Sequence, residues 1–200
     1  MTKQTKIYLV RHGESELNKQ AILAGHIDTV LTELGKQQAQ QTKDVLKGVN
    51  FDVAYSSDLA RAIQTAEIIY GKPITKRNQL VGLRERTYGE LEGLPGKVLR
   101  PTDETKYSLS HLEQWSFKNA PNMESDQELS DRFMKTLAKI AKANIGKTIL
   151  VVAHGGPIRT TLMVLNNLTN KDYPRGSFQN AGYVELAFDG NHFKVEKIRQ

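Results

Sequence analysis

Two histidines that each precede a glycine are the residues of this chain best suited to catalysis. His12 lies in the segment "LVRHG" and His154 in the segment "VVAHG", so each follows an apolar run. Such runs predict short buried strands, and neighbouring parallel strands end at one edge of a sheet, where α/β proteins bind their ligands. We therefore expect the two imidazoles to lie close together at that edge.

Arg11, Arg61 and Glu85 supply the other groups that chemistry at phosphorus needs. Two guanidinium groups can hold a dianionic phosphoryl group through paired, charge-assisted hydrogen bonds, and arginine suits this task better than lysine. His12 would attack phosphorus as a nucleophile and form a phosphoenzyme. Glu85 would donate a proton to the departing ester oxygen, and His154 would stabilise the charge on the transferring oxygens.

Each of these residues, taken alone, also has an ordinary structural explanation. Arg61 would be a solvated helix residue, and Glu85, between Arg84 and Arg86, would form a surface ion pair of small energetic weight. The remaining histidines are expected to be structural: His26, His111 and His192. The catalytic assignment therefore depends on the whole set of groups meeting at one place.

Apolar runs alternate with amphipathic segments along the chain, which predicts parallel strands joined by helical crossovers. We expect an α/β fold, a three-layer α/β/α sandwich with a mostly parallel central sheet, helices on both faces and an inserted cap segment. Strands are predicted at residues 7–10, 51–55 and 149–153, and a terminal hairpin is predicted to turn at 189–191.

Four helices are predicted from capping residues and from apolar spacing. Thr32 and Ser57 would cap the first two, Ser125 with Glu128 would form a capping box, and Pro157 would lie in the first turn of the last. Their inner faces would carry Leu34, Ala39, Thr42, Val45 and Leu46; Leu59, Ile63, Ala66 and Tyr70; Leu129, Phe133, Leu137 and Ile140; and Ile158, Leu162, Leu165 and Leu168.

Residues 1–200 are expected to form a single domain, in which residues 94–122 are an insertion over the sheet. Periodicity is weak in this segment and three prolines interrupt it, although a helix is predicted near 109–118. A loop of this length without structure would be improbable in a compact domain. We expect the insertion, which holds the single tryptophan, Trp115, to close over the pocket and to influence substrate choice.

The composition of the 200 residues limits the classes of function. The chain has no cysteine, which excludes disulfides and thiolate chemistry, and no apolar run approaches the roughly 20 residues that cross a bilayer. The formal net charge of +6 comes from scattered lysines and arginines, without a concentrated basic tract. We expect a cytoplasmic monomer or homodimer that acts on a small phosphorylated substrate and engages neither nucleic acid nor membrane.

Four segments together resemble the histidine phosphatase superfamily, in the branch of the cofactor-dependent phosphoglycerate mutases and their phosphatase relatives. The segments occur in the family's order and are "LVRHGESELN", "SSDLARAIQTA", "LRERTYGELEG" and "VVAHGGPIR". The resemblance implies that His12 is phosphorylated, that Arg11, Arg61 and His154 bind the phosphoryl group and that Glu85 donates the proton. It also implies that the substrate pocket is lined by Asn18, Ala24, Gly25, Tyr88 and Gly155, without a metal.

Departures from the family pattern favour a phosphatase over a mutase. Leu17 stands where the family often has tryptophan, and Thr87 stands where mutases typically have histidine. Residues 94–122 also lack the arginine pair and proline-rich stretch typical of mutases. A mutase must hold its intermediate through a carboxylate or second phosphate, for which Lys97 and Arg100 are candidates. The mutase, which would need 2,3-bisphosphoglycerate as a primer, therefore stays open as the alternative.

Two further classes of protein fit the sequence less well. A metallohydrolase could use His12, His154 and Glu85 as ligands, but the guanidinium of Arg11 would repel a divalent cation beside His12. A basic binding module for RNA would need neither Glu85 nor both histidines. No metal and no cofactor are therefore expected, apart from the primer that a mutase would require.

Overall fold

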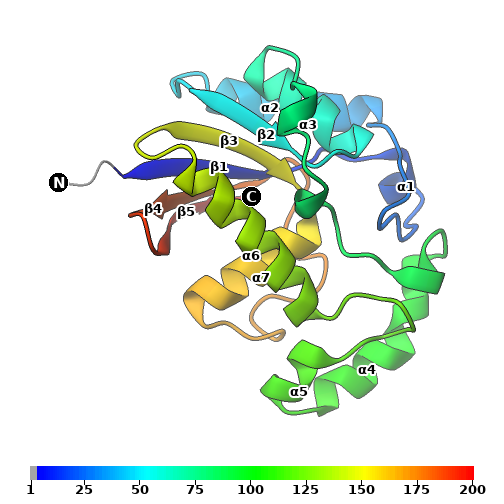
Figure 1. Cartoon of the computed structure of the whole chain (residues 1–200). Helices are drawn as coiled ribbons and strands as arrows, with labels where there is room; N and C mark the ends of the chain where they lie inside the picture. Colours follow the sequence, from blue (N-terminus) through cyan, green and yellow to red (C-terminus); the bar gives the residue numbers. More distant parts are fainter. Residues whose placement is uncertain (1–3) are drawn as a thin grey trace.

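The computed structural model describes residues 4–200, whose centre is a five-stranded sheet in the order β2-β3-β1-β4-β5 (Figure 1). The strands are β1 (Thr5–Arg11), β2 (Val53–Ser56), β3 (Thr148–Ala153), β4 (Tyr183–Phe188) and β5 (Phe193–Arg199). Strand β3 pairs in parallel with β1 and β2, whereas β4 is antiparallel to β1 and β5 is antiparallel to β4. The prediction of a mostly parallel central sheet with a terminal hairpin is confirmed.

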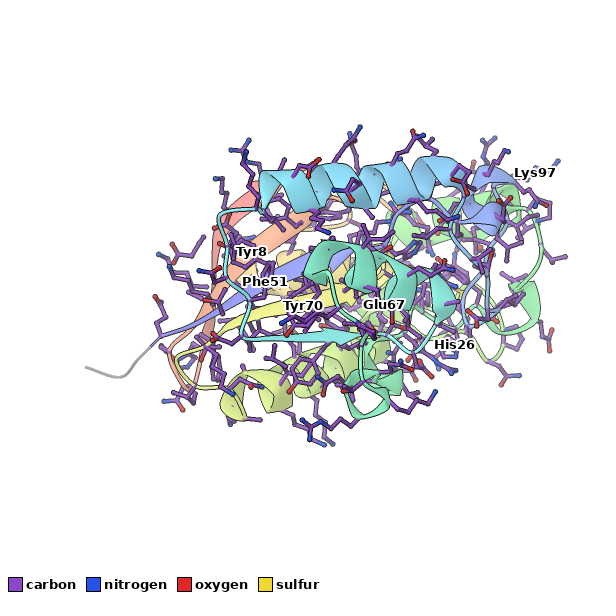
Figure 2. The ribbon with its side chains drawn as sticks, turned by 90° about the horizontal axis from the view of Figure 1, so that it is seen from above. Tyr8, His26, Phe51, Glu67, Tyr70 and Lys97 are labelled. Carbon is purple, nitrogen blue, oxygen red and sulfur yellow. The ribbon has the colours of Figure 1, made fainter. Side chains whose placement is uncertain are left out.

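Helices cover both faces of the sheet, as predicted for a three-layer sandwich. The α-helices are α1 (Glu16–Lys19), α2 (Glu33–Val45), α3 (Ala60–Tyr70), α4 (Arg100–Ser108), α5 (His111–Ser116), α6 (Asp126–Lys142) and α7 (Gly155–Asn166). Short 3-10 turns lie at Lys76–Asn78, Val81–Leu83, Gly89–Leu91 and Gly96–Leu99. Figure 2 shows α2 and α3 across one face, with Phe51 beside Tyr8 and His26 toward the opposite end of the molecule. None of the helices described within residues 4–200 is long and apolar enough to cross a membrane.

Alternate side chains of β1 and β3 enter two separate cores, because successive residues of a strand point to opposite faces. Ile7 and Leu9 pack with the apolar face of α6 and α7, while Val10 packs with α3 and the residues after α2. All five residues from Ile149 to Ala153 are fully buried, as predicted for a strand covered on both faces. Burial of both faces holds the carboxyl ends of β1 and β3 rigidly side by side.

Capping explains where two of the predicted helices begin. The Thr32 hydroxyl accepts a hydrogen bond from the backbone N–H of Gly35 at 2.9 Å, and Ser125 forms the predicted capping box with Glu128. Helix α7 begins at Gly155, so Pro157 lies in its first turn, as predicted. The inward residues predicted for α6 are all buried: Leu129, Phe133, Leu137 and Ile140.

Three details of the predicted helices are wrong. Ser57 is not the cap of α3, because the helix begins two residues later, with Leu59 as an N-cap that makes no side-chain capping bond. Leu34 and Val45 of α2 are 50% and 64% exposed. Only a narrow face of this helix, which includes Ala39 and Thr42, packs toward the sheet. Leu168 lies beyond the end of α7, which terminates at the left-handed residue Asn167.

The insertion at 94–122 contains more helix than its sequence pattern indicates. Helix α5 falls within the stretch predicted as helical. Helix α4 is not predicted by the sequence pattern, because a proline such as Pro101 usually interrupts a helix, whereas here it occupies the first turn of α4. Both helices lie beyond the ends of α6 and α7, away from the sheet (Figure 1). The insertion is therefore attached to the helical layer that contains α6.

Candidate active site

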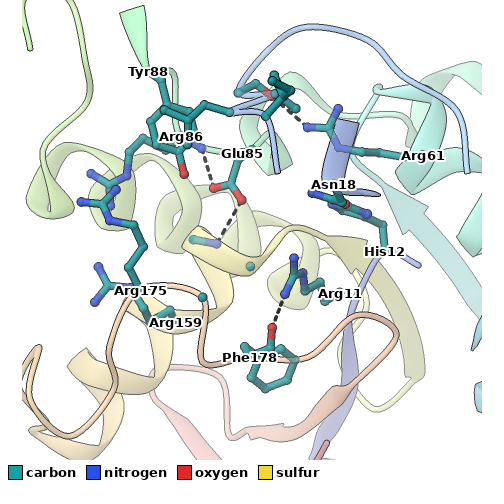
Figure 3. A pocket seen from close by; sticks show the side chains of 17 residues that line it. Arg11, His12, Asn18, Arg61, Glu85, Arg86, Tyr88, Arg159, Arg175 and Phe178 are labelled. Carbon is teal, nitrogen blue, oxygen red and sulfur yellow. Dashed lines mark hydrogen bonds between the residues drawn. The ribbon is translucent and has the colours of Figure 1, made fainter. Parts of the chain in front are cut away.

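A cavity of about 200 Å³ opens at the carboxyl ends of β1 and β3 (Figure 3). Its lining includes every site residue predicted from the sequence except His154: Arg11, His12, Asn18, Ala24, Gly25, Arg61, Glu85, Tyr88 and Gly155. His154 lies directly behind, its ring centroid 4.9 Å from that of His12. The topology therefore brings together groups from four separate segments of the chain, in a space that suits a small metabolite.

The ring of His12 is held in one tautomer. Its Nδ1 lies 2.6 Å from the carbonyl oxygen of Gly13, and because a carbonyl can only accept, Nδ1 must carry the proton. In the neutral ring, Nε2 then keeps a free lone pair. Thr65 and Gly35 fix the loop that follows: Thr65 Oγ1 accepts from the N–H of Gly13 at 3.0 Å, and a Cβ on Gly13 would overlap the backbone of Gly35. Nε2 of His12 is thus positioned before any ligand arrives.

His154 presents a hydrogen-bond donor in the same place. Arg61 Nε donates to His154 Nδ1 at 3.3 Å, so the neutral ring carries its proton on Nε2. Within residues 4–200, this buried Nε2 has no hydrogen-bond partner. A buried donor without an acceptor is costly unless a ligand satisfies it, and an oxygen of a phosphoryl group would do so.

Burial is the main reason why the pKa of both histidines lies well below the ordinary value of 6.5. The positive charges of Arg61 and Arg11 lower the pKa of His12 further. The pKa of His154 is lowered in the same way, first by burial and then by Arg61. Both rings are therefore neutral at physiological pH, which keeps the lone pair of His12 available for attack.

These lowered pKa values predict the titration of the folded protein. We expect the ring ¹⁵N shifts of His12 and His154 to remain those of neutral imidazole as the pH falls through 6.5, because protonation requires a more acidic solution. Two-dimensional NMR of ¹⁵N-histidine-labelled protein measures this directly, and the urea-unfolded chain is the control, in which all histidines titrate near their ordinary value. An imidazolium at His12 in the folded protein at pH 7 would contradict the interpretation.

Arg11 and Arg61 surround His12 with positive charge. Arg61 is 1% exposed and donates to the carbonyl oxygens of Gly25 at 2.8 Å and Ile27 at 2.9 Å, which fixes its guanidinium against the loop that follows α1. Arg11 donates to the carbonyl oxygen of Phe178, and among the described residues its buried Nε has no acceptor. The two guanidinium groups can therefore receive a dianion without first being reorganised.

Glu85 lies across the cavity from His12 (Figure 3). One carboxylate oxygen accepts from the N–H of Arg86 at 2.7 Å, and the other accepts from the N–H of Gly156 at 3.1 Å. The carbonyl of Glu85 accepts from His26 Nε2 at 2.9 Å, which gives His26 a structural hydrogen bond of the kind predicted for it. The carboxyl group is thus fixed by its neighbours while facing the cavity.

The chain matches the family model described as histidine phosphatase superfamily (branch 1) over residues 7–200. It belongs to the histidine phosphatase superfamily. Membership in this superfamily supports an enzyme of the phosphatase or mutase type, in agreement with the resemblance seen in the four sequence motifs.

Relatives within the histidine phosphatase superfamily cover most of the chain. The uncharacterized phosphatase PhoE of Bacillus subtilis is 36% identical over 98% of this chain and 92% of its own length. A 2,3-bisphosphoglycerate-dependent phosphoglycerate mutase of Methylocella silvestris is 34% identical over 84% of each chain. The crystal structure of a phosphoserine phosphatase mutant from Entamoeba histolytica, in complex with phosphoserine, superposes with a TM-score of 0.82 at 31% identity and covers 98% of this chain and 97% of its own.

The cavity of this superfamily member also contains three arginines that the sequence analysis did not assign to the site. They are Arg86, Arg159 and Arg175. Arg86 and Arg159 could have been found, because each stands inside a recognised motif, and Arg159 follows Gly155 by one helical turn on the same face of α7. Arg175 lies in an irregular segment between α7 and β4, where no periodicity indicates which side chains face inward.

The insertion does not line this cavity, contrary to our expectation. Of the described residues between 94 and 122, none is among the lining residues, so Lys97 and Arg100 do not contact the space beside His12. Trp115 instead donates to His111 at 2.9 Å within α5. Within residues 4–200, no cluster of three or more His, Asp or Glu side chains could hold a metal ion.

Gly156 provides a test of whether the position of the Glu85 carboxylate matters for turnover. A Cβ at this position would overlap the carboxylate of Glu85, so we expect Gly156→Ala to displace that carboxylate and to lower kcat about tenfold, with a smaller effect on KM. Steady-state kinetics of the purified variant measures both constants. Gly48→Ala, at an open surface position, is the control for an added methyl group. An unchanged kcat would show that the position of Glu85 does not limit turnover.

Proposed function

We propose that this chain is a phosphatase that hydrolyses the phosphate monoester of a small metabolite through a phosphohistidine at His12. The observation that carries the proposal is the Nδ1–H bond of His12 to Gly13, which leaves the lone pair of Nε2 facing a cavity between two arginines. This is the arrangement that attack on phosphorus needs, because the nucleophile is neutral and the charge of the phosphoryl group is matched.

In the first step, Nε2 of His12 bonds to phosphorus as the bond from phosphorus to the ester oxygen breaks. The carboxyl proton of Glu85 goes to the departing oxygen, so the alcohol leaves as a neutral molecule. The three oxygens of the transferring phosphoryl group are bound by Arg11, Arg61 and the Nε2–H of His154, which match their charge. Asn18, Ala24, Gly25, Tyr88 and Gly155 shape the rest of the pocket around the substrate.

In the second step, water attacks phosphorus and the bond to Nε2 breaks. Glu85, now a carboxylate, takes the proton of the water, and phosphate leaves while His12 returns to its neutral form. The cycle needs no metal and no cofactor, so activity is expected to persist in excess chelator. The same site would use 2,3-bisphosphoglycerate as a primer only if the phosphoryl group were returned to a substrate hydroxyl instead of to water.

The mutase is the second candidate. The three further arginines of the cavity, Arg86, Arg159 and Arg175, favour it. A mutase must retain its phosphorylated product while the product turns over in the site, and cations away from His12 would help to hold it. Two features favour hydrolysis instead. Thr87 stands where mutases have histidine, and the insertion contributes nothing to the cavity lining. The likeness to PhoE over nearly the full length of both chains also supports a phosphatase.

Product analysis separates the two candidates. Purified protein is incubated with a panel of phosphorylated metabolites that includes 3-phosphoglycerate, with and without 2,3-bisphosphoglycerate, and both free phosphate and 2-phosphoglycerate are measured. A phosphatase releases phosphate without the primer. Isomerisation that depends on the primer and releases no phosphate would replace this proposal by the mutase.

A further inference from the structure

The carboxylate of Glu85 is held by two backbone segments that are joined through one buried residue. Its two oxygens accept from the N–H of Arg86 at 2.7 Å and from the N–H of Gly156 at 3.1 Å (Figure 3). Arg159 follows Gly156 on α7 by about one helical turn. The side chains of Arg86 and Arg159 both donate to the same oxygen of Asp126, Oδ1, at the start of α6. Asp126 therefore links the two segments that determine where the Glu85 carboxylate lies.

The other oxygen of Asp126 is bound by the insertion. Lys106 of α4 donates to Oδ2 at 2.5 Å, and the side chains of Lys106 and Asp126 are 2% and 0% exposed. Burial raises the pKa of Asp126, but the three cations around it together lower that pKa below its ordinary value, so the carboxylate stays ionised. Although none of its described residues lines the cavity, the insertion is thus connected to the groups that hold Glu85.

Stability alone does not explain this cluster of charges. Each charge loses its hydration on burial, and apolar side chains of similar volume are often at least as stabilising in such a place. What the shared carboxylate supplies is direction. Because Lys106 occupies Oδ2, only Oδ1 is left for Arg86 and Arg159, and both guanidinium groups are drawn to one point.

Loss of Lys106 would change this geometry. Oδ2 of Asp126 would become a buried acceptor without a donor, which is destabilising, and the carboxylate can satisfy it by giving one oxygen to each arginine. That rearrangement moves Arg86 relative to Arg159. The two backbone N–H groups that hold Glu85 then move with them.

We propose that Asp126 and Lys106 are positioning residues for Glu85, so that the insertion aligns the carboxyl group from outside the cavity. This inference rests on the proposed phosphatase function, in which Glu85 protonates the leaving alcohol. The insertion then acts on the rate of the chemical step, through Lys106, rather than by contact with the substrate.

The variant Lys106→Met tests the inference, because it removes the charge and keeps a long side chain. It should fold, since Asp126 keeps both arginines and Gln114 of the insertion still accepts from Asn170 at 2.9 Å. In a single turnover, phosphoryl transfer from an alkyl phosphate should slow about tenfold, because the carboxyl group is misplaced. Transfer from p-nitrophenyl phosphate should keep its rate, because p-nitrophenolate departs without a proton.

Lys118→Met is the matched control for this substitution. Lys118 is another lysine of the insertion that pairs with an acidic residue in the first turn of α6, Glu128, at 2.7 Å, but both side chains are exposed. Its loss should leave both rates unchanged. Lys106→Arg, which keeps the charge, should restore part of the rate with the alkyl phosphate, and Lys106→Leu, a second neutral variant, should behave like Lys106→Met. Asp126 is not the first choice for substitution, because its loss leaves three buried cations without a counter-charge.

Failure of this inference can be told apart from failure of the phosphatase proposal. If the neutral variants at Lys106 slow transfer from both esters equally, or from neither, the positioning role is wrong while the phosphatase stands. If the unsubstituted protein hydrolyses no ester, NMR of the backbone amide protons of Arg86 and Gly156 still tests the inference, because an N–H that loses its carboxylate acceptor shifts upfield. Amide shifts that are the same in Lys106→Met as in the unsubstituted protein would then overturn the inference on their own.

Discussion

Replacing His12 by alanine is expected to lower kcat about 10⁵-fold, which is the scale seen when an enzyme loses its attacking nucleophile. Alanine removes the free lone pair of Nε2 of His12, while the proposed phosphoryl-binding groups of Arg11, Arg61 and His154 remain. The measurement is hydrolysis of a substrate that the unsubstituted protein turns over. Rapid mixing with the ³²P-labelled substrate should leave a protein adduct that is labile in acid and absent from the variant.

Two controls make this result specific to His12. His192→Ala changes a histidine whose side chain is 85% exposed in the turn between β4 and β5, and it should keep full activity. Circular dichroism and the melting temperature should show that His12→Ala is folded, and His12→Asn provides a second variant with a polar side chain. If His12→Ala is folded and turns over at more than about a tenth of the original rate, nucleophilic attack by this ring is excluded.

The sequence was sufficient to predict the sheet and most of the site, for a physical reason. Strands such as Ile149 to Ala153 are buried on both faces, so a continuous apolar run is required, and the first polar residue after it must lie at the ligand edge. His154 directly follows such a run, and Arg11 and His12 follow the apolar run of β1 in turn. Their proximity is a consequence of the parallel pairing of β1 with β3, in which Arg11 is opposite Ala153.

The residues that were missed lie where the backbone is irregular or where tertiary contacts decide the environment. Arg175 faces the cavity from a segment without helix or strand, so its direction is set by Asp103 and Asn119, which are distant in the sequence. Lys106 lies in the insertion, where periodicity is weak, and it is buried against Asp126. Local spacing cannot predict a buried ion pair between segments whose arrangement is unknown.

Replacing Glu85 by glutamine is expected to lower the steady-state kcat about 10³-fold, within the range for loss of general acid–base catalysis. Glutamine has nearly the same shape and keeps one oxygen for the N–H of Gly156 or Arg86, so the site should remain assembled. It cannot donate a carboxyl proton to the leaving alcohol, nor can it take a proton from the attacking water. Glu90→Gln, at an exposed position on the same stretch of chain, is the matched control and should retain normal activity.

The two roles proposed for Glu85 can be separated by the leaving group. p-Nitrophenolate departs without a proton, so Glu85→Gln should still transfer the phosphoryl group to His12 and release about one p-nitrophenol per site in a rapid burst. Water attack on the phosphohistidine lacks its base, so turnover after the burst should be slow. An alkyl phosphate needs the proton in the first step and should show no burst. If the first step slows equally with both leaving groups, Glu85 is not the acid, and its carboxylate only positions the backbone N–H groups of Arg86 and Gly156.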